Sequence, residues 1–365
     1  MSNSKIFTPY IFSRNNITVK NRTVLAAMTN KQSHKNGKIS DDEIKWLLRR
    51  ARGGFGLLTT AATNVSLESK AWEGEFGVYS DLHIPNLRKL TSAVHKTESL
   101  IIAQLFHGGM RSPQNLTGQT PISASEFDCK ESFSGKSKKA DEKDIDKIIN
   151  DFTSSALRCA EAGFDGVELH GAHGYLISQF LGKKTNLRND KWGGSLKSRA
   201  RLLIQIYKSI RKTVPDSFIV GVRISPEIEG LGINLQDSIR LIGILKQHSV
   251  DFIHLSCWDS FSKSLSIPND KRTVTEIITE SFDSLPCIIS TGSVWSTKHA
   301  NDLICKGADL IGVGRVAIAH PDWPKNLQNP NYNPKPPPYS TLELKKAKLN
   351  ENFISYMRNW EGFVK

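Results

Sequence analysis

The sequence has few cysteines, and none has the spacing of a metal or redox motif. Its 365 residues include five cysteines and no Cys-x-x-Cys pair. An odd, scattered set argues against a disulfide framework and against a zinc or iron–sulfur cluster. We therefore expect no metal. The cysteines are Cys129, Cys159, Cys257, Cys287 and Cys305.

Long apolar runs and leader patterns are also missing. No window approaches the roughly 18 consecutive apolar residues that a membrane span requires. The first residues, MSNSKIFTPYIF, lack the charged and then apolar pattern of a signal peptide. These absences predict a cytoplasmic protein with no membrane partner.

Acidic residues are outnumbered, with 36 Asp and Glu against 49 Lys and Arg, a net charge of +13. Such a charge favours anionic partners, including nucleic acid and phosphorylated cofactors. Many of the lysines fall in polar stretches such as 129–139 and 342–349, which favours a general surface bias. We expect no nucleic-acid partner, and the sequence allows a homo-oligomer.

Short apolar segments rich in β-formers alternate with segments of helical period. This pattern predicts a single (β/α)₈ TIM barrel over residues 1–325. A doubly wound sheet is the alternative, but no GxGxxG motif follows the first strand. The expected strands are 23–28, 55–62, 100–106, 164–170, 218–224, 251–256, 286–291 and 309–314. The expected helices are 41–51, 84–96, 146–163, 195–213, 235–249, 273–282 and 296–307.

A C-terminal extension rich in proline and asparagine follows the barrel over residues 326–365. Its extended segment is expected to lead into a short helix over 341–357. We expect this extension to clasp the barrel or a neighbouring subunit.

Active sites of such barrels lie at the C-terminal ends of the strands. The last two strands end in glycine-containing turns at Gly292-Ser293 and Gly314-Arg315, which favour phosphate binding by backbone N–H groups and a guanidinium. Alternatively, these glycines only let the chain turn. Arg223 ends the apolar fifth strand, where a buried cation without an anion would be costly.

Strand four ends in two histidines and a tyrosine within HGAHGY, residues 170–175. A zinc site would need further ligands, and no HExxH motif is present. His170 and His173 could also be histidines satisfied by the backbone at a strand end. In a third interpretation, they donate two N–H groups to a substrate oxygen while Tyr175 supplies a proton. That chemistry requires a hydride carrier, and a phosphate-bearing flavin would fit.

The sequence resembles the Old Yellow Enzyme family of FMN-dependent ene-reductases, in its single-domain form, over roughly residues 10–325. The resemblance rests on AGFDGVELHGAHGYLISQFL followed by NLRNDKWGGSLKSRARL, and on VGVRISP and IGVGRVAIAHPDWP. It extends to NRTVLAAMT, GLLTTAATNVS and STGSVWS. It implies FMN as cofactor, NADPH or NADH as reductant, and a small electron-poor alkene as substrate.

Positions for the cofactor follow from the resemblance. Thr29 and Ala62 would approach the reactive edge of the flavin, beside Ala27, which replaces a common proline. Gln104 would bind the pyrimidine ring, and Arg223 would stabilise the anionic reduced flavin. The implied phosphate-binding residues are Gly292, Ser293, Gly314 and Arg315.

Positions for the substrate follow in the same way. His170 and His173 would bind the carbonyl or nitro oxygen, Tyr175 would protonate the α carbon, and Phe106 would shape the pocket. Lys31 and residues 181–192 depart from the family pattern. The alternatives are a flavin-binding scaffold with little turnover and a dihydrouridine-synthase-like enzyme acting on tRNA. The latter group uses a cysteine acid that HGGMRSPQNLTG lacks.

Overall fold

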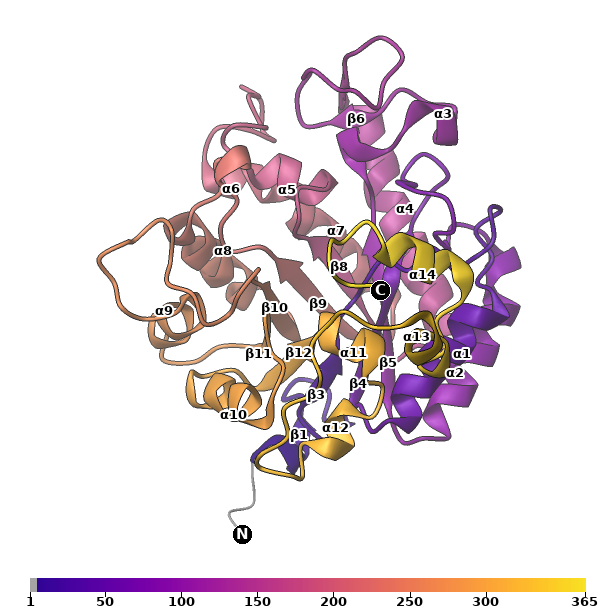
Figure 1. Ribbon diagram of the computed structural model, residues 1–365. Helices are drawn as coiled ribbons and strands as arrows, with labels where there is room; N and C mark the ends of the chain where they lie inside the picture. Colours follow the sequence, from indigo (N-terminus) through magenta and orange to yellow (C-terminus); the bar gives the residue numbers. More distant parts are fainter. Residues whose placement is uncertain (1–4) are drawn as a thin grey trace.

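The computed structural model describes residues 5–365 and contains a closed barrel of eight parallel strands (Figure 1). Around the barrel the strands follow one another in chain order, and β12 closes the ring against β3. The predicted (β/α)₈ barrel is therefore confirmed. The strands are β3 (Thr23–Leu25), β4 (Leu57–Asn64), β5 (Leu100–Phe106), β8 (Gly166–Gly171), β9 (Ile219–Ile224), β10 (Phe252–Ser256), β11 (Cys287–Thr291) and β12 (Leu310–Val313).

The helices that cover the barrel begin at polar capping residues. Ser40, Asn234 and Ser296 each accept a hydrogen bond from the backbone of the following helix. The predicted helix 195–213 is divided at Ala200 into a short helix α6 and α7. The main helices are α1 (Asp41–Arg52), α2 (Ile84–His95), α4 (Glu142–Glu161), α6 (Leu196–Arg199), α7 (Arg201–Thr213), α8 (Leu235–Gln247), α9 (Val274–Glu280) and α10 (Thr297–Cys305).

Shorter elements lie in the loops. The connection after β5 is the longest of these, and a small two-stranded sheet forms within it. The short elements are α3 (Gln114–Thr117), β6 (Ile122–Ser123), β7 (Lys138–Lys139), α5 (Leu176–Leu181), α11 (Arg315–Ala319) and α12 (Trp323–Asn326). No helix within residues 5–365 combines the length and apolarity that crossing a membrane demands.

The lower half of the barrel is filled with apolar side chains. Phe252 belongs to this cluster, and Gly221 leaves room for its ring, since a Cβ at Gly221 would lie 2.3 Å from the ring. An N-terminal hairpin, β1 (Tyr10–Ile11) and β2 (Thr18–Val19), adds Phe12 and Val19 to the same cluster. Because this end is plugged, ligands must enter at the C-terminal ends of the strands.

The C-terminal extension contacts its own barrel. The guanidinium of Arg50 donates to the carbonyl of Ala347 at 2.6 Å, and Trp46 packs edge-on against Phe353. The single helix predicted over 341–357 was wrong: the structure has α13 (Thr341–Lys346) and α14 (Glu351–Met357). Lys348 takes a positive φ of 69° between them, which breaks the helix. Figure 1 shows α14 across the mouth of the barrel.

Candidate active site

A cavity of about 730 Å³ lies at the C-terminal ends of the strands. Its lining comes from the strand ends, the loops that follow them and the segment around α14. Every site residue predicted from the sequence lines this cavity except Phe106. The lining residues among them are Ala27, Thr29, Ala62, Gln104, His170, His173, Tyr175, Arg223, Gly292, Ser293, Gly314 and Arg315.

Phe106, which was predicted to shape the pocket, does not itself line the cavity. Its side chain is fully buried and lies behind the wall, because its ring packs edge-on against Tyr175 at 4.5 Å. It also contacts Trp72, whose ring lies 5.3 Å away and lines the cavity. Phe106 therefore supports two lining residues from behind.

The two histidines lie side by side, with ring centroids 4.9 Å apart. Nδ1 of His170 accepts a hydrogen bond from the backbone of Ala172, so Nε2 carries the proton in the neutral ring. Nε2 of His173 lies 2.7 Å from the Ser256 hydroxyl. Burial lowers the pKa of both imidazoles well below the usual value, so both rings are neutral at pH 7. A neutral imidazole still has one N–H to donate to an acceptor.

Within the described part of the chain, no third ligand joins the histidine pair. Within residues 5–365, no three His, Cys, Asp or Glu side chains gather as a potential metal site. His173 has a positive φ of 60°, which turns the chain sharply after β8. This turn brings both rings and Tyr175 to the same side of the cavity.

Tyr175 is held by an aromatic and cationic environment. Its ring centroid is 5.0 Å from that of His170, and the guanidinium of Arg111 lies 4.4 Å from its centre. Burial raises the pKa of Tyr175, and the charge of Arg111 opposes that rise. The hydroxyl therefore stays protonated at neutral pH and is able to act as an acid.

Arg223 is buried beneath the cavity. Its guanidinium donates to the carbonyl of Ala27 at 3.2 Å and to the hydroxyl of Ser256 at 2.9 Å. Its Nε has no hydrogen-bond partner among residues 5–365. Burial lowers the pKa of Arg223, and the charge of Glu168 opposes this effect. A buried cation with an unused donor next to a cavity is suited to binding a ligand acceptor.

The ends of β11 and β12 form the second pole of the cavity. Arg315 donates to the Ser293 hydroxyl at 3.1 Å, which joins the two turns. Ser293 itself has a positive φ of 53°. A Cβ at Gly292 would lie 2.6 Å from the Cys257 carbonyl, so the turn requires glycine there. A guanidinium, a hydroxyl and open backbone at one place are suited to a phosphate.

Comparison with known proteins identifies the chain. The sequence model of the NADH:flavin oxidoreductase / NADH oxidase family matches residues 5–333. The chain belongs to this family. The probable NADH-dependent flavin oxidoreductase YqiG of Bacillus subtilis is 30% identical over 364 residues, which are 98% of this chain and 97% of YqiG.

Two further matches bear on the family. The NADH:fumarate oxidoreductase of Klebsiella pneumoniae is 31% identical over 332 residues, 88% of this chain but only 36% of that longer protein. The solved structure of the Old Yellow Enzyme homologue from Zymomonas mobilis is 27% identical, with a TM-score of 0.79. That match covers 90% of this chain and 94% of the homologue. The Old Yellow Enzyme resemblance is confirmed, and the chain is an FMN-dependent NAD(P)H:flavin oxidoreductase.

The cavity of this family member fits FMN. Its volume lies within the range of about 300–1,000 Å³ that is usual for cofactor and ligand pockets. One pole offers Arg315 and Ser293 for the phosphate, and the other offers the unpartnered Nε of Arg223 for an anionic ring edge. The donor set therefore matches the two charged parts of the cofactor.

The departures at Lys31 and residues 181–192 have little contact with this cavity. None of residues 181–192 lines the cavity, and their side chains make structural contacts instead. Asn186 donates to the carbonyls of Phe180 and Trp192, both at 2.8 Å. Lys31 reaches the cavity only indirectly, since its ammonium lies 5.2 Å from the ring centre of Tyr356.

Several lining residues were missed by the sequence reasoning. Ser256 ends β10, so reading that strand end would have found it. Trp72 lies in a loop and Arg111 ends a short 3-10 helix (Gly109–Arg111), where no spacing rule identifies them. Tyr356 and Trp360 come from the C-terminal extension, and Tyr356 is hydrogen-bonded to the Thr29 side chain. Their approach to the cavity depends on how the extension folds back.

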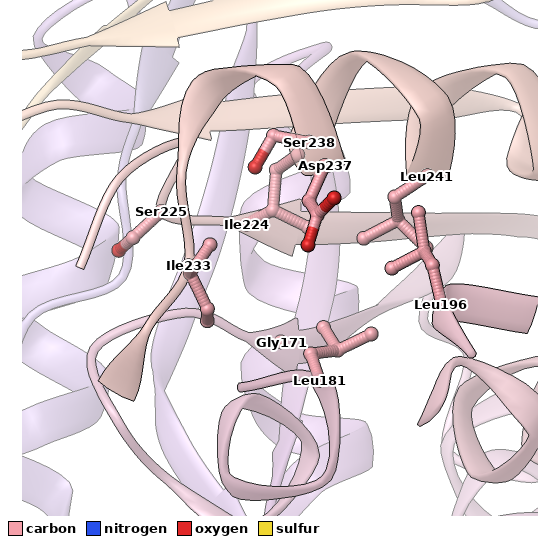
Figure 2. Close-up of a pocket in the computed structure, with 9 residues that line it drawn as sticks. All are labelled: Gly171, Leu181, Leu196, Ile224, Ser225, Ile233, Asp237, Ser238 and Leu241. Atoms are coloured by element: carbon pink, nitrogen blue, oxygen red, sulfur yellow. The ribbon is translucent and has the colours of Figure 1, made fainter. Parts of the chain in front are cut away.

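A second cavity lies between the barrel and α8 (Figure 2). Its volume is about 10 Å³, close to the least that one water molecule needs, roughly 10–15 Å³. The carboxylate among its lining residues, Asp237, already pairs with Arg199 at 2.8 Å. This cavity is too small for a substrate.

Proposed function

We propose that this oxidoreductase reduces the activated C=C bond of α,β-unsaturated carbonyl or nitro compounds. The observation that carries the proposal is the convergence of two neutral histidines and a protonated tyrosine on one cavity. The His170 ring centroid lies 4.9 Å from that of His173 and 5.0 Å from that of Tyr175. One small group that contains an oxygen and its neighbouring carbons can reach all three side chains.

In the proposed reaction, the histidines bind the substrate oxygen. Negative charge develops on this oxygen as hydride arrives at the β carbon, so N–H donors fixed in advance lower the barrier. Nε2–H of His170 and the ring of His173 fill this role. FMN, when bound, supplies the carrier that takes hydride from NAD(P)H and passes it to the alkene.

Tyr175 supplies the proton in this proposal. Its hydroxyl stays protonated because burial raises its pKa. Transfer of that proton to the α carbon completes the saturation of the C=C bond, and solvent then restores the phenol.

The proposed cofactor contacts combine the family resemblance with the cavity, which all of these residues line. Arg223 would hold the pyrimidine edge of bound FMN, where its fixed positive charge would stabilise the reduced ring. Gln104 would bind the same ring, and Thr29 would approach its reactive edge with the backbone of Ala27 and Ala62. The proposed phosphate-binding residues are Gly292, Ser293, Gly314 and Arg315.

The tRNA-modifying alternative receives no support from the cavity. The long loop after β5 contains one cysteine, Cys129, which is buried with its thiol 3.0 Å from the carbonyl of Met110. Cys129 does not line the cavity. We therefore keep an electron-poor alkene as the proposed substrate.

Anaerobic stopped-flow absorbance of the purified holoenzyme tests the proposal. We expect a yellow protein that NADPH or NADH bleaches, and whose colour an enone or a nitroalkene restores. The variant pair His170→Ala and His173→Ala should keep bleaching but lose most of the second step. A protein that takes up no FMN, or a reduced enzyme that no alkene reoxidises, would refute the proposal.

A further inference from the structure

A chain of short hydrogen bonds crosses the barrel interior beneath the active site. The Gln104 amide donates to Oε1 of Glu168 at 2.6 Å, and Oε2 of Glu168 lies 2.6 Å from Nδ1 of His254. Nε2 of His254 then lies 2.6 Å from the hydroxyl of Thr291. Both ends, Gln104 and Thr291, line the cavity, whereas the two middle residues are completely buried.

The contacts define the protonation of this chain. Burial opposes ionisation of Glu168, but the hydrogen bond from His254, the charge of Arg223 and the hydrogen bond from Gln104 hold its pKa below the usual value. Burial lowers the pKa of His254, which favours the neutral ring. His254 therefore donates from Nδ1 to Glu168, and its Nε2 accepts the proton of the Thr291 hydroxyl. The net charge of the group is that of one carboxylate.

An ionised carboxylate can only accept hydrogen bonds, so it fixes the orientation of Gln104. The amide nitrogen must face Glu168, which leaves the carbonyl oxygen for the cavity. Thr291 is constrained in the same way, because its proton is committed to His254. The two ends of this series of hydrogen bonds, Gln104 and Thr291, thus both present acceptor oxygens to the cavity. These acceptors match N–H and O–H donors such as the one ring N–H of a flavin and its ribityl hydroxyls.

The carboxylate also balances a charge. Glu168 and Arg223 lie on the neighbouring strands β8 and β9, and their charges interact in the buried floor of the site. With the carboxylate present, the two charges offset each other. Without it, the positive charge of Arg223 would act on the cavity uncompensated.

We infer that Glu168 is a positioning residue for the cofactor: it fixes Gln104 as an acceptor and offsets the charge of Arg223. This inference rests on the proposed placement of the flavin ring beside Gln104 and Arg223. Replacing the carboxylate with an amide removes the offset and lets the Gln104 side chain reverse. The anionic reduced state of FMN then gains stability, while the oxidised cofactor loses its fixed acceptor.

The test compares Glu168→Gln with the matched variant Asp251→Asn. Asp251 is also a buried carboxylate paired with an arginine, Arg14 at 2.6 Å, but it precedes β10 at the opposite end of the barrel. The readouts are the midpoint potential of bound FMN, from equilibration with a reference dye, and the dissociation constant of oxidised FMN.

We expect Glu168→Gln to shift the equilibrium toward reduced FMN at least tenfold, about 30 mV for a two-electron couple. Its affinity for oxidised FMN should fall severalfold. Asp251→Asn should leave both values within twofold of wild type. Unchanged values in Glu168→Gln, or an equal shift in Asp251→Asn, would overturn the inference.

A second variant keeps the inference testable if Glu168→Gln does not fold. Glu168→Asp keeps the charge but shortens the side chain, so the potential should stay close to wild type while FMN affinity falls. A potential that rises in Glu168→Asp as well would count against the charge-offset role. None of these measurements uses an alkene, so the substrate proposal can fail while this inference stands, and the reverse also holds.

Discussion

Ser256 contacts both Arg223 and His173, and removal of its hydroxyl gives a quantitative test of the site. Its hydroxyl accepts from Arg223 at 2.9 Å and lies 2.7 Å from Nε2 of His173. Because the oxygen already accepts from the guanidinium, its own proton is available for His173. That contact makes Nε2 the acceptor and leaves the proton of the neutral ring on Nδ1. Ser256 thus selects the tautomer and orientation of His173.

The variant Ser256→Ala removes both contacts. One hydrogen bond contributes about 0.5–1.5 kcal/mol when neutral and about 1.5–3 kcal/mol when one partner is charged. Only the neutral contact to His173 affects the transition state for alkene reduction, and it contributes about 0.5–1.5 kcal/mol. This corresponds to a fall of about 2- to 12-fold in kcat/KM for the alkene.

The assay is the reoxidation of pre-reduced enzyme by an enone in stopped flow. Ser256→Thr is the matched control, because it keeps the hydroxyl on a strand that tolerates β-branched residues, and it should retain most of the rate. A Ser256→Ala enzyme reoxidised within twofold of the wild-type rate would refute the role given to this hydroxyl.

Three further predictions address other parts of the structure. Arg315→Ala should weaken FMN binding about 10- to 100-fold, since a charged hydrogen bond is lost; an unchanged dissociation constant in fluorescence titration contradicts this. Arg111→Met should slow alkene reduction severalfold but not bleaching by NAD(P)H, because loss of the nearby charge raises the pKa of Tyr175 and makes it a weaker acid; equal alkene rates would disprove it. Burial lowers the pKa of His107 to about 3 in the folded protein. In the unfolded state the imidazole has its ordinary pKa of about 6.5 and binds a proton that the folded state does not. The free energy of unfolding therefore falls as the pH drops below about 6.5. Between pH 7.5 and 5.5 the free energy of unfolding, measured with urea, should fall by about 1.4 kcal/mol less in His107→Gln than in the wild type. An unaltered pH dependence would exclude this explanation.

The barrel could be predicted from the sequence because each apolar segment is short, rich in β-branched residues and followed by a helix. The site residues at the strand ends could also be predicted from the sequence. The active sites of such barrels lie at the C-terminal ends of the parallel strands, and Gln104, His170 and Arg223 lie at those ends around one cavity. The capping residues determined most helix starts to within a few residues. Asp141 makes a capping box with Asp144, so α4 starts before the predicted 146.

Other features depend on tertiary contacts that a linear pattern does not contain. Phe106 belongs to a strand end, but its side chain points behind the wall. The helix predicted over 341–357 has continuous helical propensity, yet Asn350 caps a new helix after the break. Glu168 and His254 look like polar positions within strands, and only closure of the barrel brings them into contact.

Tyr175→Phe tests the central claim most directly, through the rate at which an enone reoxidises the pre-reduced enzyme. The substitution removes only the hydroxyl, so the ring contacts with Phe106 and Arg111 are retained. We predict normal FMN binding and normal bleaching by NAD(P)H, with reoxidation slowed on the order of 100-fold or more. Reoxidation at the wild-type rate would contradict the account, because the proton would then come from another source.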